Sequence, residues 1–243
     1  MNDPIPMDPR ARFEDEFRRF HEMSAARPAR FSVDPNDIHP CLNDRTEVTE
    51  FDPHYIYHTG WAARKLAQFT REYHVDISSS LYFSSIVSAF VPVRVYDYRA
   101  PPLYLDNLRS AHADLANLPF PDNSLRSLSC MHVVEHVGLG RYGDALDPEG
   151  DLKAMAELKR TLISGGQFLF VVPVGGRARV VFNAHRIYRF EQIVTCFQDL
   201  TLEEFALVPD NPGREGLIRY ASGDLADRQV YGCGCFCFRK EPE

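Results

Sequence analysis

The chain has 243 residues, 44% of them hydrophobic, which is enough for one domain with an extension and excludes wholesale disorder. Its net charge of −7 gives no electrostatic reason to expect a nucleic-acid partner. The first ten residues lack a basic start and an apolar run, and no apolar stretch approaches the ~20 residues of a membrane span. We therefore expect a soluble, cytoplasmic protein without a membrane span or a nucleic-acid partner.

Residues 1–50 are expected to form an N-terminal extension rich in Pro, Asp and Arg. Within it, Phe13, Phe17 and Phe20 recur at helical spacing, which predicts an amphipathic helix over residues 10–23. This helix is expected to dock on the main domain or on a second subunit, so a homodimer is among the expected assemblies.

A second helix is predicted over residues 59–72, with Thr59 as its N-cap. Three large apolar residues lie near one face of this helix, namely Trp61, Leu66 and Phe69. From their position in the chain, we expect the two N-terminal helices to cover a bound cofactor as a lid.

Strands and helices alternate from Tyr73 onward, which indicates a mostly parallel sheet with helices on both faces. The helix over residues 147–163 is the clearest, because apolar residues recur in it every three or four positions, at Leu152, Met155, Leu158 and Leu162. The other predicted helices cover residues 80–90 and 189–197. The predicted strands cover residues 73–77, 93–98, 124–134, 166–174, 200–208 and 228–240.

Three of the six cysteines alternate near the end of the sequence, at Cys233, Cys235 and Cys237. On a strand they point to one face, because strand side chains repeat every second residue. This spacing suits neither disulfide partners nor paired zinc ligands, which usually have two or more residues between them. We interpret the three as small apolar residues in a buried face, and we expect no metal site.

Ligands of open α/β sheets bind at the carboxyl ends of the strands, so polar residues at those points are candidates for binding. Asp76 ends the first predicted strand, and serines follow it at residues 78–80, where a nucleotide-binding loop normally carries glycines. Asp97 ends the next strand 21 residues later, and its two oxygens suit the two hydroxyls of a ribose. An ordinary strand-to-helix turn and a solvated loop acid remain the alternatives.

The middle of the chain carries the most specific motifs. Asp114 is followed by LPFPDNSLRS at residues 118–127, by the pair Glu135-His136, and by AELKRTLISGGQFLFVVP at residues 156–173. This series resembles the class I S-adenosylmethionine (SAM)-dependent methyltransferases, in particular the methyltransferase-11-like group. The segments EHVGLGRYGD and FNAHRIY also resemble a less characterised branch of that superfamily, some of whose members belong with glycan or cell-surface biosynthesis.

The resemblance, which extends from Tyr73 to Arg239, implies a Rossmann-like class I methyltransferase fold for the domain of residues 51–243. The implied sheet is mostly parallel and seven-stranded, with an antiparallel last strand. SAM is the implied cofactor. The implied contacts are Asp76, Ser78 and Ser80 for its methionine part, Asp97 for the ribose, Asp114 and Leu115 for the adenine, and Met131 and His132 beside the sulfonium.

Candidates for catalysis and for substrate binding come from the later strand ends. The long polar segment after Glu135 has the length of a functional loop, and imidazoles titrate near neutrality, as a general base requires. The candidate catalytic residues are Glu135, His136 and His185, and the candidate substrate residues are Arg141, Tyr142, Asn183, Arg186 and Tyr188. A structural role at the strand ends is the alternative for each histidine.

The chain departs from the family pattern twice, in the serines at residues 78–80 and in Arg126, where an acidic or small residue is usual. The leading hypothesis is a SAM-dependent methyltransferase acting on a small molecule, sugar or glycan. The alternative is a non-catalytic methyltransferase-like module with a degenerate cofactor loop. A nicotinamide-dependent oxidoreductase would need the glycine fingerprint that this sequence lacks.

Overall fold

The computed structural model describes residues 8–26, 28, 30–68 and 71–241. The chain divides into two units, Met1–Phe51 and Asp52–Glu243. Within the described residues, no helix is both long enough and apolar enough to cross a membrane.

The first unit contains helix α1 (Pro9–Ala25) and the short 3₁₀ helix η1 (Pro35–Asp37). The carboxylate of Asp8 caps α1 by accepting the N–H of Ala11, and a proline in the first turn has no N–H left to satisfy. The helix predicted over residues 10–23 is confirmed.

The second unit is built on a seven-stranded sheet of order β3-β2-β1-β4-β5-β9-β8. Its strands are β1 (His74–Ile77), β2 (Val93–Asp97), β3 (Leu108–His112), β4 (Leu125–Met131), β5 (Leu162–Val174), β8 (Thr201–Val208) and β9 (Gly232–Arg239). Strands β1 to β5 are parallel, and β9 is antiparallel to both of its neighbours. The predicted mostly parallel sheet with an antiparallel last strand is confirmed. Strands β6 (Arg179–Val181) and β7 (His185–Ile187) form a separate hairpin.

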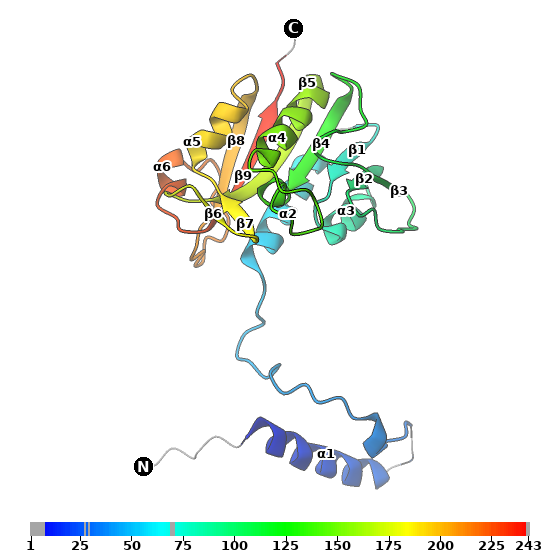
Figure 1. The fold of residues 1–243 in the computed structure, drawn as a ribbon. Helices are drawn as coiled ribbons and strands as arrows, with labels where there is room; N and C mark the ends of the chain where they lie inside the picture. Colours follow the sequence, from blue (N-terminus) through cyan, green and yellow to red (C-terminus); the bar gives the residue numbers. More distant parts are fainter. Residues whose placement is uncertain (1–7, 27, 29, 69–70, 242–243) are drawn as a thin grey trace. The chain divides into compact units, whose positions relative to one another are not determined.

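Helices cover both faces of this sheet, as Figure 1 shows. Apolar residues of α4 (Gly150–Thr161) and α5 (Phe190–Cys196) pack on one face, and those of α2 (Pro53–Ala67) and α3 (Leu81–Val87) pack on the other. Two short helices, η2 (Val134–His136) and α6 (Gly223–Ala226), complete the unit. The two hydrophobic cores therefore lie on opposite sides of one sheet.

Successive side chains of strand β9 point to opposite faces of the sheet and so contribute to the two cores in turn. Cys233, Cys235 and Cys237 are buried on the face covered by α2 and α3, and the alternating Phe236 and Phe238 are buried on the other face. The prediction that the three cysteines share one buried face is confirmed.

Three details differ from the sequence predictions. Helix α2 begins at Pro53 with Asp52 as its N-cap, so Thr59 lies inside it, where its hydroxyl donates to the carbonyl of Tyr55. Leu152 on α4 is 49% exposed and does not join the core. Strand β3 was not predicted, because an edge strand of sequence LRSAH lacks an apolar run. Phe69 lies outside the described residues.

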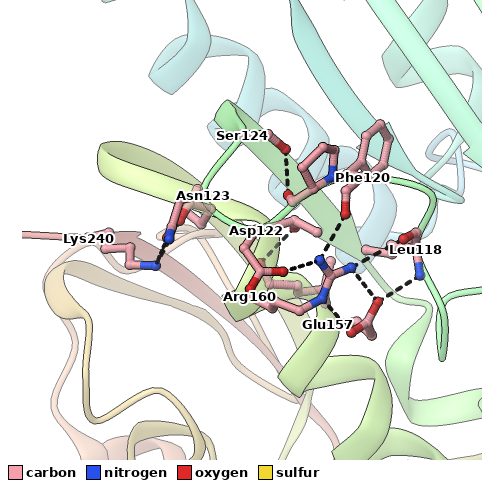
Figure 2. A network of polar contacts seen from close by, with 12 residues as sticks. Leu118, Phe120, Asp122, Asn123, Ser124, Glu157, Arg160 and Lys240 are labelled. Atoms are coloured by element: carbon pink, nitrogen blue, oxygen red, sulfur yellow. Dashed lines mark hydrogen bonds and ion pairs between the residues drawn. The ribbon is translucent and has the colours of Figure 1, made fainter.

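The LPFPDNS segment is held by α4, as Figure 2 shows. Arg160 donates to the backbone oxygens of Leu118 and Phe120 at 3.2 and 2.8 Å. Its guanidinium also bonds the carboxylates of Asp122 and Glu157 at 2.6 and 2.7 Å. This part of the motif therefore has a structural role, because it ties the connection between β3 and β4 to α4.

A buried carboxylate on β8 anchors α2 to the sheet. Glu204 accepts hydrogen bonds from Lys65 Nζ at 2.5 Å and from Trp61 Nε1 at 3.2 Å, and Arg219 bonds both of its oxygens. Burial disfavours the charged form of Glu204, but the bonds from Arg219 and Lys65 outweigh burial and lower its pKa to about 2. Trp61 is 3% exposed and packs in the core between α2 and the sheet, so its side chain is not available to cover a cofactor.

Glu204→Gln is expected to lower the free energy of unfolding at pH 7 by about 3 kcal/mol, because it leaves the Lys65 ammonium buried without its counter-charge. The pKa of Glu204 is about 2 in the folded chain and about 4.3 when unfolded. The unfolded chain therefore binds more protons between these values, and the stabilisation present at neutral pH is lost as the pH falls through that window. Urea unfolding should show the difference between wild type and variant shrinking from about pH 5 to about pH 2.

Glu203→Gln is the matched control, because the neighbouring carboxylate pairs with Arg239 at the surface and is 32% exposed. Its loss is expected to cost less than about 1 kcal/mol. Equal losses in the two variants would contradict the anchoring role of Glu204.

Candidate functional site

A cavity of about 330 Å³ lies at the carboxyl ends of β1 to β4, which is where open α/β sheets bind their ligands. Its volume lies at the lower end of the range for small-molecule sites. The cavity brings together five of the residues predicted to bind a cofactor, namely Ser78, Asp97, Asp114, Leu115 and His132. Tyr98, Arg99, His136 and Tyr142 also line it.

The serine turn after β1 has the backbone of a glycine turn. Ser78 has φ of 55°, in the left-handed region that glycine usually occupies. Its N–H donates to the carbonyl of Tyr96 at 2.8 Å and its hydroxyl donates to the same oxygen at 3.2 Å. The two bonds hold the strained conformation, so the chain turns away from the cavity without a glycine.

The acids at the next two strand ends, Asp97 and Asp114, line the cavity. Asp97 accepts the N–H of Arg99 through Oδ1 at 2.6 Å, and Asp114 accepts the N–H of Ala116 through Oδ1 at 2.9 Å. Each acid thus fixes its own turn with one oxygen. The arrangement places two acidic residues on one cavity at the strand ends.

Three other predicted cofactor residues lie outside the lining of the cavity. Asp76 is fully buried, and its oxygens accept the hydroxyls of Ser129 and Ser84; burial raises the pKa of this carboxyl. Ser80 is the N-cap residue of α3, and Met131 packs in the core between the sheet and α2. Asp76 and Met131 therefore support the sheet beneath the cavity, because their side chains are buried there.

A second cavity of about 670 Å³ adjoins the first. His132, His136 and Tyr142 line both cavities, so the two share a wall at the end of β4. The other residues around the second cavity are mostly aromatic or ionisable, namely Asp52, Pro53, His54, Tyr55, Glu135, Arg141, Ala184, His185 and Tyr231.

Glu135 and two histidines form the polar floor of this second cavity. His132 Nδ1 lies 2.9 Å from Glu135 Oε1, and burial lowers the pKa of His132 to about 4. Burial also raises the pKa of Glu135 to about 7. His136 Nδ1 donates to the carbonyl of Ala184 at 2.6 Å, and burial lowers the pKa of His136. His136 is therefore neutral at pH 7, with a lone pair on Nε2 that can accept a proton.

The loop after His136 folds around one carboxylate. Asp144 accepts the N–H of Gly138 at 2.7 Å, of Tyr142 at 3.2 Å and of Gly140 at 3.4 Å. Both glycines have positive φ, of 79° and 69°, which lets the loop curl over the carboxylate. The loop therefore holds Tyr142 at the boundary of the two cavities.

The residues predicted to contact substrate separate into two groups. Arg141 and Tyr142 line the second cavity, as does His185, a candidate catalytic residue. Arg186 and Tyr188 instead bind the buried Asp151 of α4, at 3.5 and 2.9 Å, and Asn183 lies in the hairpin connection outside both cavity linings. Two side chains of the FNAHRIY segment are therefore bound to the buried Asp151 of α4.

Sequence reasoning missed the contribution of α2 and β9 to the second cavity. His54 and Tyr55 lie in the first turn of α2, and Tyr231 immediately precedes β9. The signal was present in the segment DPHYIYH, where an Asp-Pro helix start is followed by two histidines and two tyrosines. It was obscured because the predicted helix began six residues too late.

Comparisons with known proteins show the fold. Residues 122–202, about a third of the chain, match the family described as a Caenorhabditis protein of unknown function, DUF268. No curated protein matches the sequence. The structure is similar to the N-methyltransferase NodS from Bradyrhizobium japonicum WM9 in complex with S-adenosyl-L-homocysteine, with 16% identity, a TM-score of 0.53 and coverage of 84% of this chain and 92% of NodS.

A second similar structure is the 1,6-didemethyltoxoflavin-N1-methyltransferase of Burkholderia thailandensis, with bound 1,6-didemethyltoxoflavin and S-adenosylhomocysteine. Its identity is 13% and its TM-score is 0.53, and the match covers 99% of this chain and 93% of that one. The chain therefore has the Rossmann-like fold of class I methyltransferases.

Ser78→Val is expected to lower the free energy of unfolding by about 2 kcal/mol, because a β-branched residue tolerates the left-handed region poorly. Chemical denaturation measures this loss. Ser80→Val is the control, since Ser80 has φ of −58° and makes no side-chain capping bond. Equal stability of the two variants would mean that the turn does not hold Ser78 at positive φ.

Proposed function

We propose that the protein is a SAM-dependent methyltransferase that acts on a small molecule, sugar or glycan. The observation that carries this proposal is the pair of adjoining cavities at the strand ends, with a shared wall of His132, His136 and Tyr142. A methyl donor and an acceptor must meet at such a boundary, because the transfer requires the reacting atoms within about 3–3.5 Å.

The smaller cavity suits the cofactor. Asp97, Asp114 and Leu115 line it, and in this proposal Asp97 accepts the ribose hydroxyls while Asp114 and Leu115 bind the adenine edge. Ser78 supplies a turn with glycine geometry, which supports cofactor binding over the non-catalytic alternative that the serines suggested. Bound SAM would supply an electrophilic methyl group, and the protein would supply orientation and exclusion of water.

The larger cavity suits the acceptor. Its lining of tyrosines, histidines, Arg141 and Glu135 offers hydrogen bonds to a polar molecule. For a hydroxyl acceptor, His136 Nε2 would take the proton, because the bond from Nδ1 to Ala184 leaves Nε2 as the acceptor. Residues 51–243 would then carry both binding functions, and residues 1–50 would be an extension.

Asp97→Asn is expected to weaken S-adenosylhomocysteine binding at least about 10-fold, because the charged acceptor is worth about 1.5–3 kcal/mol in hydrogen bonds to the ribose. The amide oxygen keeps the bond to the Arg99 N–H, so stability should change little. Isothermal titration calorimetry measures the affinity.

The control is Asp106→Asn, which changes an exposed acid that is outside the cavity lining. Its affinity should equal that of the wild type. Wild-type affinity of Asp97→Asn for S-adenosylhomocysteine would remove Asp97 from the cofactor site. A wild-type protein that binds neither SAM nor S-adenosylhomocysteine at millimolar ligand would refute the methyltransferase proposal.

His136→Ala is expected to lower kcat about 100-fold on a hydroxyl acceptor, the usual effect of losing a general base. The measurement is transfer of radiolabelled methyl from SAM to a panel of polar small molecules and glycans, followed by kinetics on the best acceptor. Raised pH should partly restore the variant, because an ionised acceptor needs no base. An unchanged kcat would assign His136 a structural role.

A further inference from the structure

Three metal-binding side chains converge at the base of the second cavity. They come from distant parts of the chain: His54 from the first turn of α2, His132 from the end of β4, and Cys233 from β9. One ligand atom from each lies within 4.8 Å of the other two. Cys233 is fully buried, His132 is 9% exposed, and both histidines line the cavity.

The spacing of the three groups approaches that of tetrahedral coordination. Zn–S and Zn–N bonds of about 2.3 and 2.0 Å place two ligand atoms about 3.5 Å apart, and place the ring centres of two bound imidazoles about 5.2 Å apart. Cys233 Sγ lies 3.4 Å from His132 Nε2, and the ring centres of His54 and His132 are 5.6 Å apart. Ligand atoms that are now up to 4.8 Å apart would have to approach to about 3.5 Å to bind one ion.

The surroundings of His132 are those of a metal-bound histidine. Its Nδ1 is bonded to the carboxylate of Glu135, which leaves Nε2 directed at the Cys233 thiol. Metal-ligating histidines usually have such a carboxylate partner, which fixes the tautomer. His132 also holds a φ of 56°, and strained backbone of this kind is concentrated at functional sites.

A second feature of Glu135 points to a missing polar partner. Its side chain is 1% exposed and lines the second cavity. Among the described residues, no group bonds its Oε2 atom. Because buried polar atoms are rarely left without a partner, this oxygen indicates that the cavity holds a ligand or water beside the histidines.

We propose that His54, His132 and Cys233 bind one Zn²⁺ ion. Two imidazoles and a thiolate are ligands that zinc prefers, and three protein ligands leave a fourth position open, as in catalytic zinc sites. The thiol releases its proton to solvent when the ion binds. The open position faces the second cavity, where an oxygen, nitrogen or sulfur atom of a bound molecule can occupy it. This proposal does not depend on SAM binding.

The 3.4 Å distance between Cys233 and His132 also suits a thiol–imidazole hydrogen bond without a metal. A metal site and a metal-free hydrogen bond differ in the number of ions bound per chain and in the absorption spectrum with Co²⁺. The untagged full-length protein, stripped with a chelator and dialysed, is titrated with Zn²⁺ by calorimetry and with Co²⁺ by absorption spectroscopy. We expect one ion per chain, intense visible bands of tetrahedral cobalt and a near-ultraviolet cobalt–thiolate band.

Two matched pairs of variants assign the ligands. Cys233→Ser should remove the cobalt–thiolate band, whereas Cys235→Ser, which changes the adjacent thiol 3.9 Å away, should keep it. His54→Gln should weaken Zn²⁺ binding more than about 100-fold, since loss even of an outer partner costs about 10–100-fold. His185→Gln changes another histidine of the same cavity and should bind Zn²⁺ as the wild type does.

The proposal is overturned if the wild-type protein binds less than a tenth of an equivalent of Zn²⁺ or if its cobalt spectrum lacks a thiolate band. It is also overturned if the His54→Gln variant binds Zn²⁺ with the affinity of the wild type. Because His54 lies at a helix start and is not in the hydrophobic core, that variant remains informative if the Cys233 variant fails to fold. S-adenosylhomocysteine binding, measured separately, distinguishes failure of the zinc site from failure of the proposed methyltransferase function.

Discussion

The hydrogen bond between Glu135 and His132 is the interaction on which the site depends. It closes the turn at the end of β4, holds His132 in a left-handed conformation and fixes the ring that divides the two cavities. Both partners are buried, so the bond is not exchanged for bonds to bulk water. If the ring turned, the boundary between the two cavities and the contact with Cys233 would change together.

A stiff sheet maintains this strained turn and the one at Ser78. His74 on β1 bonds the hydroxyls of Ser127 and Ser129 on β4, at 2.7 and 2.9 Å, and Asp76 shares Ser129. This fully buried polar chain joins the two central strands beneath the cavity. Left-handed residues persist only where surrounding structure over-determines them, and two neighbouring strand ends here carry one each.

Sequence patterns predicted most of the fold, because buried strands and amphipathic helices have strong periodicities. They also placed Asp97 and Asp114 correctly at the cavity, since parallel strands end at one edge. The failures have two physical causes. Arg186 lies outside both cavity linings because it bonds the carbonyl of Val137 and pairs with the buried Asp151 of α4, which no local pattern reveals. The His54 and Cys233 pair is separated by most of the domain, so ligand spacing in the sequence could not show it.

Helix α2 links the stability of the scaffold to the geometry of the site. Glu204 holds Lys65 near its carboxyl end, whereas His54 stands in its first turn beside the second cavity. At 1.5 Å per residue these points lie about 16 Å apart along one rigid element. The position of His54 at the second cavity therefore depends on how α2 is held, and the ion cluster that holds α2 lies outside both cavity linings. We expect substitutions in that cluster to affect the site through the helix.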